Sequence, residues 1–265
     1  MSLDTLILAG GFAKRFRPLS DYVPKPLFPV GGVPLIYYII EKALETGSDE
    51  IIISTNKKYE NHFRHILAAL YSFYEPSQIG KIRLVIEPSN SEENKLGSIG
   101  GLHYAIKEMN INNNLLVLLG DNLFSFYLNK IIKLGNENNS IALAIYDVKN
   151  PDDAKNYGVV KLENNIIKEF YEKPQNPPST KISTGIYYIP DKKLYLLDEY
   201  MNSNYSKDSM GNFFEYLIKR GEKLYGNVYN DDNEYWFDIG TIESYQRANN
   251  FVSEKVYIGD GYGHK

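Results

Sequence analysis

Glycines and cations are concentrated directly after the first apolar run of the chain. Gly10 and Gly11 follow "LILA". Four cations interspersed with prolines come next, namely Lys14, Arg15, Arg17 and Lys25. Because glycine has no Cβ, the backbone can turn sharply there and approach a ligand with its N–H groups, while the cations attract anions. This composition predicts a phosphate-binding loop, although neither G-x-x-x-x-G-K-[ST] nor G-x-G-x-x-G occurs. A solvated cationic surface above a plain turn is the simpler alternative.

Two aspartates end apolar segments farther along the chain. Asp121 follows "LLVLLG", and Asp238 lies in "WFDIGT". Each has a plain alternative as a turn or helix-capping residue. Placed together beside a cationic loop, they would instead suit magnesium, which takes one or two carboxylates together with phosphate oxygens. Glu172 and Lys173 of "EKP" form a further polar cluster, which by itself predicts no more than a surface ion pair.

The overall composition limits the classes of function. The chain has 265 residues, a formal net charge of -4, 43% hydrophobic residues and no cysteine, which is ample for a packed core. The negative charge gives no general attraction to nucleic acid or to an anionic membrane. The lack of cysteine excludes disulfides, thiolate zinc sites and cysteine nucleophiles. No apolar run has the length of a membrane span or the layout of a signal peptide, so we expect a cytoplasmic protein.

Short apolar runs alternate with helical patterns in the first half of the sequence. The predicted strands are residues 5–10, 49–55, 82–88 and 115–121, and the predicted helices are residues 34–47, 58–73 and 100–109. Uninterrupted apolar strands that alternate with helices are typical of a parallel sheet covered on both faces. Ligands of such sheets bind at the carboxyl ends of the strands. The glycine-containing loop and Asp121 fall at such ends.

Antiparallel pieces are predicted in the second half. A hairpin is expected over residues 157–174, further strands over 140–148, 183–190, 223–229 and 234–239, and helices over 192–200, 212–221 and 243–252. Asn-rich stretches at 110–114, 136–139 and 230–233 are expected to be polar loops. Asp238 ends the last predicted strand. We predict one α/β domain with a mixed, mainly parallel sheet, helices on both faces and added antiparallel strands.

Several segments taken in order identify a family. They are "LAGGFAKRFRPLSDYVPKPLFPVGGVPLI", "LGSIGGL", "LLGDNLF", "YGVVKL", "FYEKP", "STGIYYI" and "YWFDIGTIESY". In these segments the chain closely resembles the sugar-1-phosphate nucleotidylyltransferases, also called NDP-sugar pyrophosphorylases. The resemblance implies a Rossmann-like fold, called the nucleotide-diphospho-sugar transferase fold, with residues 1–254 as the catalytic domain, 255–265 as a tail, and no β-helix domain.

The resemblance also implies an activity and a role for individual residues. A hexose 1-phosphate would attack the α-phosphorus of a nucleoside triphosphate and release pyrophosphate, with Mg2+ as the cofactor. The residues implied are Arg15 and Lys25 at the reacting phosphates; Leu8, Gly10, Gly11, Glu87, Gly97 and Asn122 at the nucleotide; Gly158, Glu172, Lys173, Thr184 and Gly185 at the sugar phosphate; and Asp121 and Asp238 at magnesium. Lys173 would meet the phosphate of the sugar, and Glu172 its hydroxyls.

The chain departs from the family pattern at a few positions. Ala13 and Lys14 replace the usual glycine and threonine of G-x-G-T-R, Ser183 replaces an asparagine, and an acidic run occupies 89–95. "GDNLF" resembles the glucose-1-phosphate thymidylyltransferases, whereas "LGSIGGL" is closer to the mannose-1-phosphate guanylyltransferases. We expect glucose 1-phosphate with a pyrimidine triphosphate, thymidylyl or uridylyl, and keep mannose and guanylyl as the alternative. Other classes considered are a non-catalytic sugar-nucleotide regulatory protein and a dinucleotide-dependent oxidoreductase. A homo-oligomer is compatible with the sequence.

Overall fold

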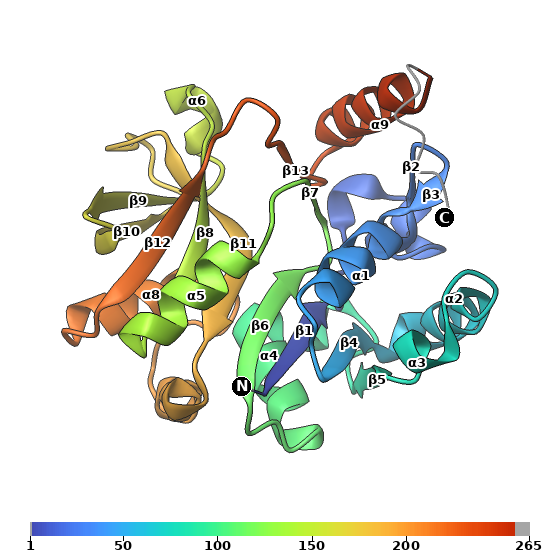
Figure 1. The fold of residues 1–265 in the computed structure, drawn as a ribbon, viewed down its shortest axis with the longest axis horizontal. Coiled ribbons are helices and arrows are strands. Elements are labelled where there is room, and N and C mark those ends of the chain that lie inside the picture. The colour runs from blue at the N-terminus through green and yellow to red at the C-terminus, as the bar shows by residue number, and fades with distance from the viewer. Residues whose placement is uncertain (1, 258–265) are drawn as a thin grey trace.

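The first half of the chain forms the parallel part of a large sheet. The computed structural model describes residues 2–257 (Figure 1). The parallel strands lie in the order β5-β4-β1-β6. Their bounds are β1 Leu3–Leu8, β4 Glu50–Asn56, β5 Ile82–Glu87 and β6 Asn114–Leu119. The predicted strands of this half are confirmed, because each one is an apolar run long enough to be buried on both faces.

Antiparallel pairing enters at β6, where the sheet continues into the second half. The order after β6 is β11-β8-β12-β10-β9, and β11 also pairs with β9. The bounds are β8 Ala142–Asp147, β9 Gly158–Glu163, β10 Ile166–Glu172, β11 Lys181–Ile189 and β12 Leu224–Tyr229. The predicted β9–β10 hairpin is confirmed, and Asn164 and Asn165 turn it with φ values of 49° and 63°, as a tight hairpin turn requires.

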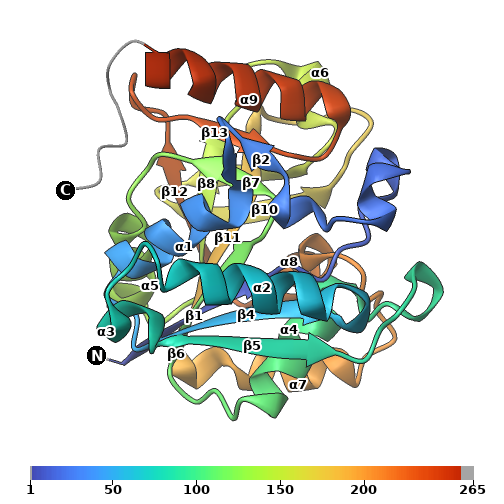
Figure 2. The ribbon, with the colours of Figure 1, turned by 90° about the vertical axis from the view of Figure 1, so that its right-hand side faces the viewer.

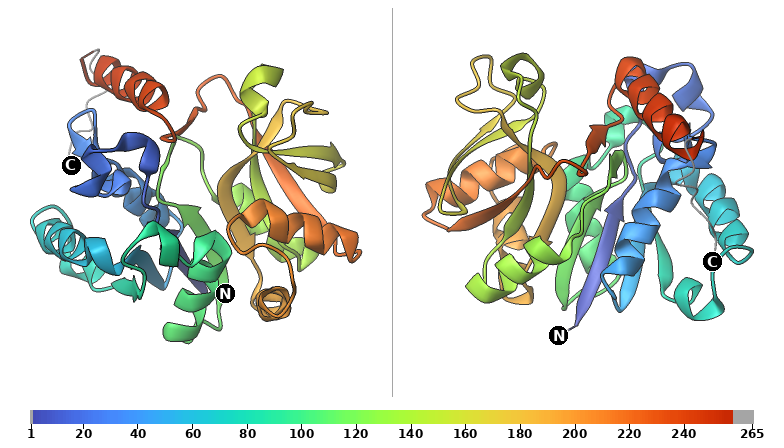
Figure 3. Two further views of the ribbon diagram at one scale, coloured as in Figure 1. Left: turned by 180° about the vertical axis from the view of Figure 1, so that it is seen from behind. Right: turned by 45° about the horizontal axis from the view of Figure 1, so that its top comes forward.

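Helices cover both faces of the sheet (Figure 2). On one face lie α1 Leu35–Glu45, α2 Glu60–Leu70 and α5 Asn129–Asn138, and on the other lie α4 Gly97–Glu108, α7 Tyr195–Met201 and α8 Met210–Lys219. Side chains alternate between two hydrophobic cores, because successive residues of a strand point to opposite faces. Ile7 and Ile51 belong to the first core, and Leu6 and Ile52 to the second. Figure 3 (left) shows the molecule from behind, with the second of these faces toward the viewer.

Two small two-stranded sheets accompany the main one. Strand β7 (Asn122–Phe124) pairs antiparallel with β13 (Trp236–Asp238), and β2 (Pro29–Val30) pairs with β3 (Val33–Pro34). Asp238 does end a strand, as predicted, but this strand lies outside the main sheet. Helix α9 (Ile242–Tyr257) lies against β2 and β13, and Asn249 accepts a hydrogen bond from the Gly31 N–H at 2.9 Å.

Shorter elements complete the fold. They are the 3-10 turns η1 Lys14–Phe16, η2 Leu19–Asp21, η3 Lys25–Leu27, η4 Lys57–Tyr59, η5 Glu92–Asn94 and η6 Asp191–Lys193, and the short helices α3 Pro76–Ile79 and α6 Pro151–Ala154. No helix within residues 2–257 is both long enough and apolar enough to cross a bilayer.

Two further sequence predictions concern a loop at 136–139 and the end of the domain. The loop predicted over 136–139 is wrong, because α5 continues to Asn138 and ends at Asn139 with φ 46°. Asn138 donates back to the Leu134 carbonyl at 2.8 Å, which keeps the last turn helical. The domain boundary predicted after residue 254 falls inside α9, and residues 258–265 of the predicted tail lie outside the described part.

Candidate active site

A cleft of about 610 Å³ opens along the carboxyl ends of β1 and β6. Its walls come from both halves of the chain, including the loop after β1, the first turn of α4, the β9–β10 hairpin and the start of α8. The cleft brings together every residue that the sequence assigned to the site: Leu8, Gly10, Gly11, Arg15, Lys25, Glu87, Gly97, Asp121, Asn122, Gly158, Glu172, Lys173, Thr184, Gly185 and Asp238. Their individual roles remain predictions.

Aromatic side chains anchor the loop after β1. Phe12 and Phe16 are each 5% exposed and pack into the core, which leaves Lys14 and Arg15 exposed on the cleft wall. Ala13 has φ 46°, in the left-handed region that favours glycine. The turn geometry is therefore present although the glycine usual at this position in the family is not.

A buried carboxylate lies beside the glycines of the nucleotide side. Glu87 is 5% exposed, and the Ser54 hydroxyl donates a hydrogen bond to its Oε1 at 2.9 Å. A Cβ added at Gly10 or Gly101 would lie 2.6 Å or 2.9 Å from the same oxygen, so both positions need glycine if the carboxylate is to keep its place. Burial raises the pKa of Glu87, and the Ser54 hydrogen bond opposes this rise. The carboxyl can accept a hydrogen bond from a base bound in the cleft.

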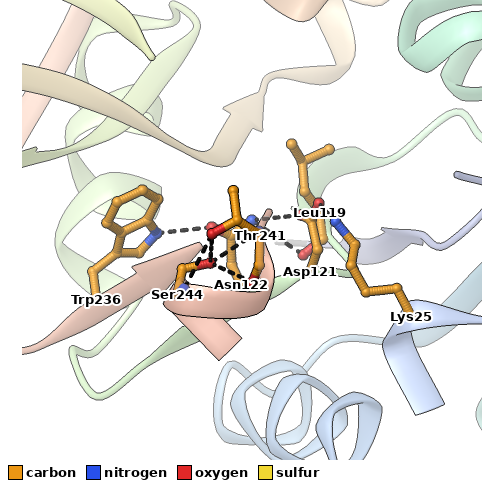
Figure 4. Close-up of polar contacts among 7 residues, drawn as sticks. All are labelled: Lys25, Leu119, Asp121, Asn122, Trp236, Thr241 and Ser244. Carbon is orange, nitrogen blue, oxygen red and sulfur yellow. Dashed lines mark hydrogen bonds and ion pairs between the residues drawn. The ribbon is translucent and has the colours of Figure 1, made fainter. Parts of the chain in front are cut away.

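A row of polar contacts fixes the turn between β6 and β7 (Figure 4). Lys25 Nζ lies 2.5 Å from Asp121 Oδ2, and Asn122 Nδ2 donates to Asp121 Oδ1 at 3.1 Å. The Trp236 indole N–H donates to Asn122 Oδ1 at 2.8 Å and lies 3.2 Å from the carbonyl oxygen of Thr184. Asn122 therefore orients Asp121 while Trp236 holds Asn122 in turn.

Asp238 approaches Asp121 through the pairing of β13 with β7. Asp238 lies opposite Asn122 in the register, and the Ile239 N–H donates to the Asp121 carbonyl oxygen at 2.8 Å. Burial and the charge of Asp121 raise the pKa of Asp238 to about 7, and the cations Lys25 and Arg15 oppose the rise. Two carboxyl groups in one cleft wall repel each other when both are ionised.

This pair of carboxyl groups has the chemistry of a magnesium site that is completed by substrate. Magnesium is commonly held by one or two carboxylates together with phosphate oxygens, and a cation would relieve the repulsion that raises the pKa of Asp238. Among residues 2–257 no group of three or more His, Cys, Asp or Glu side chains could hold a metal. Asp121 and Asp238 could therefore hold magnesium if bound phosphates supplied further oxygen ligands.

The part of the cleft that the sequence assigned to the sugar phosphate, here called the sugar side, contains Glu172 at the end of β10. Its backbone N–H donates to Glu215 Oε1 at 3.0 Å, and its carboxyl lies against Gly211 so closely that any Cβ there would collide with Glu172 Oε2. A Cβ added at Gly158 would likewise collide with the Phe170 ring. Burial raises the pKa of Glu172, whereas a hydrogen bond from Ser209 lowers it.

Lys173 and the middle of β11 complete this side. Lys173 has φ 47°, its N–H donates to the Tyr157 carbonyl oxygen at 3.1 Å, and its side chain is 62% exposed. Gly185 has φ 80°, and a Cβ there would lie 2.7 Å from Leu119 Cδ1. The Thr184 hydroxyl donates to the Ala144 carbonyl oxygen at 2.9 Å, so Thr184 contributes mainly backbone to the cleft.

Sequence reasoning missed part of the cleft wall. Among the missed residues are Tyr157, Tyr187, Ser209, Met210 and Gly211. Ser209 caps α8 by accepting a hydrogen bond from the Gly211 N–H at 3.1 Å. A serine directly before an amphipathic run is a recognised helix-start signal, so "DSMGNFFEYL" could have placed the start of α8. No comparable signal in the sequence marks Tyr157 or Tyr187 as cleft residues.

Comparisons with known proteins identify the family of the chain. The family model described as nucleotidyl transferase matches residues 4–255, so the chain belongs to the nucleotidyl transferase family. It is 31% identical over 256 residues to the bifunctional protein GlmU of Methanocaldococcus jannaschii, covering 96% of this chain and 55% of that protein. It is 29% identical to the UTP–glucose-1-phosphate uridylyltransferase of Synechocystis, covering 93% of this chain and 62% of that protein. The chain thus spans between about half and two thirds of the length of these relatives.

A solved structure is similar to this chain over nearly the whole length of both. The crystal structure of a Bacillus anthracis protein assigned as a glucose-1-phosphate thymidylyltransferase, in complex with sucrose, superposes with a TM-score of 0.75 at 25% sequence identity and 96% coverage of both chains. The fold is therefore that of the sugar-1-phosphate nucleotidyltransferases, as the sequence predicted.

Proposed function

We propose that this chain transfers a nucleotidyl group from a nucleoside triphosphate to a hexose 1-phosphate in a magnesium-dependent reaction that yields an NDP-sugar and pyrophosphate. One observation carries the proposal. A single cleft places the cationic loop with Arg15, the carboxyl groups of Asp121 and Asp238, and Lys173 of the hairpin around one space. That combination provides separate positions for a triphosphate, a metal and a second phosphate.

The chemistry needs positioning and charge neutralisation more than a side-chain nucleophile. An oxygen of the sugar phosphate would form a bond to the α-phosphorus as the bond from that phosphorus to pyrophosphate breaks. Arg15 and Lys25 would neutralise the charge on the triphosphate and on the leaving pyrophosphate. Asp121 and Asp238 would hold magnesium, which would supply positive charge to neutralise the phosphates. Lys173 would hold the attacking sugar phosphate, and Glu172 would accept hydrogen bonds from sugar hydroxyls.

For the substrates, we propose glucose 1-phosphate and a pyrimidine triphosphate, dTTP or UTP. The names of the Synechocystis and Bacillus relatives pair glucose 1-phosphate with uridylyl and thymidylyl transfer, and "GDNLF" supports the same assignment. GTP with mannose 1-phosphate is the alternative, supported by "LGSIGGL".

The test is a substrate matrix. The purified protein is incubated with Mg2+, each of five triphosphates (ATP, CTP, GTP, UTP and dTTP) and glucose, mannose or N-acetylglucosamine 1-phosphate, and released pyrophosphate is measured. Pyrophosphate release that requires both substrates is expected, and Asp121→Asn should reduce it severely because the metal site loses a carboxylate. Silence over the whole matrix, with nucleotide binding retained, would instead favour a non-catalytic sugar-nucleotide regulatory protein. Binding of a nicotinamide dinucleotide in a titration would favour an oxidoreductase.

A further inference from the structure

The segment between β5 and α4, residues 89–96, forms part of the cleft wall and is here called the strap. It contains η5 (Glu92–Asn94), and Glu92, Lys95 and Leu96 line the cleft. Asn94 Oδ1 accepts hydrogen bonds from the backbone N–H groups of Asn90 and Ser91 at 3.1 Å and 2.9 Å. The strap is therefore internally ordered, and its charged side chains have defined positions.

A row of ion pairs joins the strap to both sides of the cleft. Lys14 Nζ lies 3.5 Å from Glu92 Oε1, and Lys95 Nζ lies 2.9 Å from the same oxygen. Lys95 Nζ also lies 3.9 Å from Asp208 Oδ1, at the start of the sugar side. Glu92 is only 18% exposed, whereas Lys14 is 57% exposed. One carboxylate thus restrains the cation that stands next to Arg15 on the phosphate-binding loop.

The position of Lys14 relative to the rest of the site decides which phosphates it can meet. In the function proposed above, the nucleotide would lie at Glu87 and Gly10, and the reacting α-phosphorus between the two aspartates and Lys173. The outer phosphates would then extend toward the loop after β1, where Lys14 and Arg15 are exposed on the cleft wall. A polyphosphate carries more negative charge than a single carboxylate, so it competes effectively for an exposed lysine.

We propose that Lys14 is an additional cation for the outer phosphates of the nucleotide, and that Glu92 is a positioning residue that competes with those phosphates for it. This proposal rests on the function proposed above. Lys14 pairs with Glu92 when the cleft lacks a polyphosphate and with the outer phosphates when one is bound. Glu92 thereby lowers the affinity for the triphosphate and speeds the release of pyrophosphate, which is the leaving group of the reaction.

The experiment is a double-mutant cycle on ligand binding. Dissociation constants in the presence of Mg2+ are measured by calorimetry for inorganic pyrophosphate, for the best-bound of the five triphosphates, and for the matching monophosphate. Glu92→Gln should tighten binding of pyrophosphate and triphosphate about two- to fivefold, the range expected for loss of an exposed ion pair, and leave monophosphate binding unchanged. Lys14→Met should weaken binding of pyrophosphate and triphosphate about tenfold. In the Lys14→Met background, Glu92→Gln should have no further effect.

A matched control exists outside the cleft. Lys57 and Glu60 form a pair with side-chain exposures of 57% and 16%, close to the 57% and 18% of Lys14 and Glu92, and Glu60 also holds a second cation, Arg64. Glu60→Gln should change none of the dissociation constants. Thermal unfolding checks that all variants are folded.

Two results would overturn the proposal: binding by Glu92→Gln that is unchanged or weaker, or a Glu92→Gln effect that persists without Lys14. Because pyrophosphate binding needs no sugar substrate, these results can be told apart from failure of the proposed activity, which appears only in the substrate matrix.

Discussion

The two carboxyl groups of Asp121 and Asp238 differ in how closely a cation compensates their charge. Lys25 lies 2.5 Å from Asp121 Oδ2, whereas burial and the charge of Asp121 raise the pKa of Asp238 from 3.8 to about 7. A carboxyl whose pKa is raised on folding favours the folded state while it is protonated, and this contribution is lost as the pH rises from the unfolded to the folded pKa. In the absence of metal, ionised Asp238 therefore destabilises the fold.

The first prediction concerns the loss of stability that ionised Asp238 causes. Asp238→Asn replaces the group by a neutral amide of similar shape, so metal-free protein should gain stability on the order of 2 kcal/mol at pH 8. The gain should shrink as the pH falls from 7 toward 4, where the wild-type carboxyl is protonated in the folded state. Urea unfolding followed at several pH values measures it. Asp152→Asn, an exposed aspartate paired with Lys155, should give no gain, and a gain that is independent of pH would contradict the explanation.

The second prediction concerns Lys173. Its side chain is 62% exposed and extends from a positive-φ residue on the cleft wall. Lys173→Ala should raise the KM for the sugar phosphate about tenfold or more, because a charge-assisted contact to phosphate is lost, and leave the KM for the triphosphate nearly unchanged. Lys168→Ala, which removes an exposed ion pair with Glu163 on the same hairpin, is the comparison. If the triphosphate KM rose instead, Lys173 would belong to the nucleotide side.

At the scale of elements, the start of α8 determines the shape of the sugar side. Ser209 caps the helix, and Gly211 in its first turn leaves room for the Glu172 carboxyl. A side chain at this position must either displace Glu172 or shift the helix. The packing at the start of α8 thus constrains the position of the Glu172 side chain on β10.

The third prediction follows from that packing. Gly211→Ala should raise the KM for the hexose 1-phosphate several-fold by displacing Glu172, with the triphosphate KM retained. The matched variant is Gly135→Ala in α5, where a Cβ would collide with the Tyr188 ring. This variant should lose about 1–3 kcal/mol of stability through overpacking, without a selective effect on the sugar phosphate. Steady-state kinetics and thermal unfolding distinguish the two outcomes, and similar kinetics for both variants would contradict a role for α8 in the sugar site.

The elements that the sequence predicted are those whose packing leaves a periodic signature. Strands such as β6 are apolar over nearly all of their length, here residues 115–119, because both faces are buried. By contrast, α5 ends in "GNEN", in which the glycine and the two asparagines have low helix propensity. Its last turn therefore also depends on a tertiary contact that no local pattern shows, the hydrogen bond that the Tyr188 hydroxyl donates to Asn136. Strand β7 has three residues and pairs only with β13, and it was missed because so short a segment has no period.

The candidate site was predictable for a different reason. The glycines and cations after β1 and the two aspartates were recognised from residue type and position at strand ends, and the family resemblance supplied the other residues and all of the specific roles. What could not be predicted is how the side chains meet, since Asp121, Asp238 and Lys25 are distant in sequence and only tertiary packing sets the distance between them. The ion pair between Lys14 and Glu92 joins two features that appeared unrelated in the sequence, the extra lysine and the acidic run.

At the scale of the whole molecule, the cleft is lined by residues from both halves of the chain. Trp236 is the one tryptophan in the sequence. It lies in the cleft wall, is 9% exposed, and packs edge-on against Tyr157 at 5.1 Å between ring centroids. Its environment should therefore change when substrates fill the cleft.

The fourth prediction uses this residue as a built-in reporter. Tryptophan fluorescence should change saturably on titration with triphosphate and Mg2+, and change again when a hexose 1-phosphate analogue is added. Trp236→Phe should abolish the signal. Because the indole N–H donates to Asn122 and lies near the Thr184 carbonyl, the same variant should also lower turnover by loosening Asn122 and, through it, Asp121. An unchanged turnover would show that Asn122 holds Asp121 without help.

The pairing of β13 with β7 also sets an order of events during synthesis. Asp121 and Lys25 belong to the first half of the chain, whereas Asp238 is supplied by β13, and α9 then lies against β2. A ribosome-bound chain that has exposed the sequence as far as β12 can complete the main sheet before Asp238 is available. Under the function proposed above, the magnesium site would therefore be completed only after β13 has been synthesised and has paired with β7.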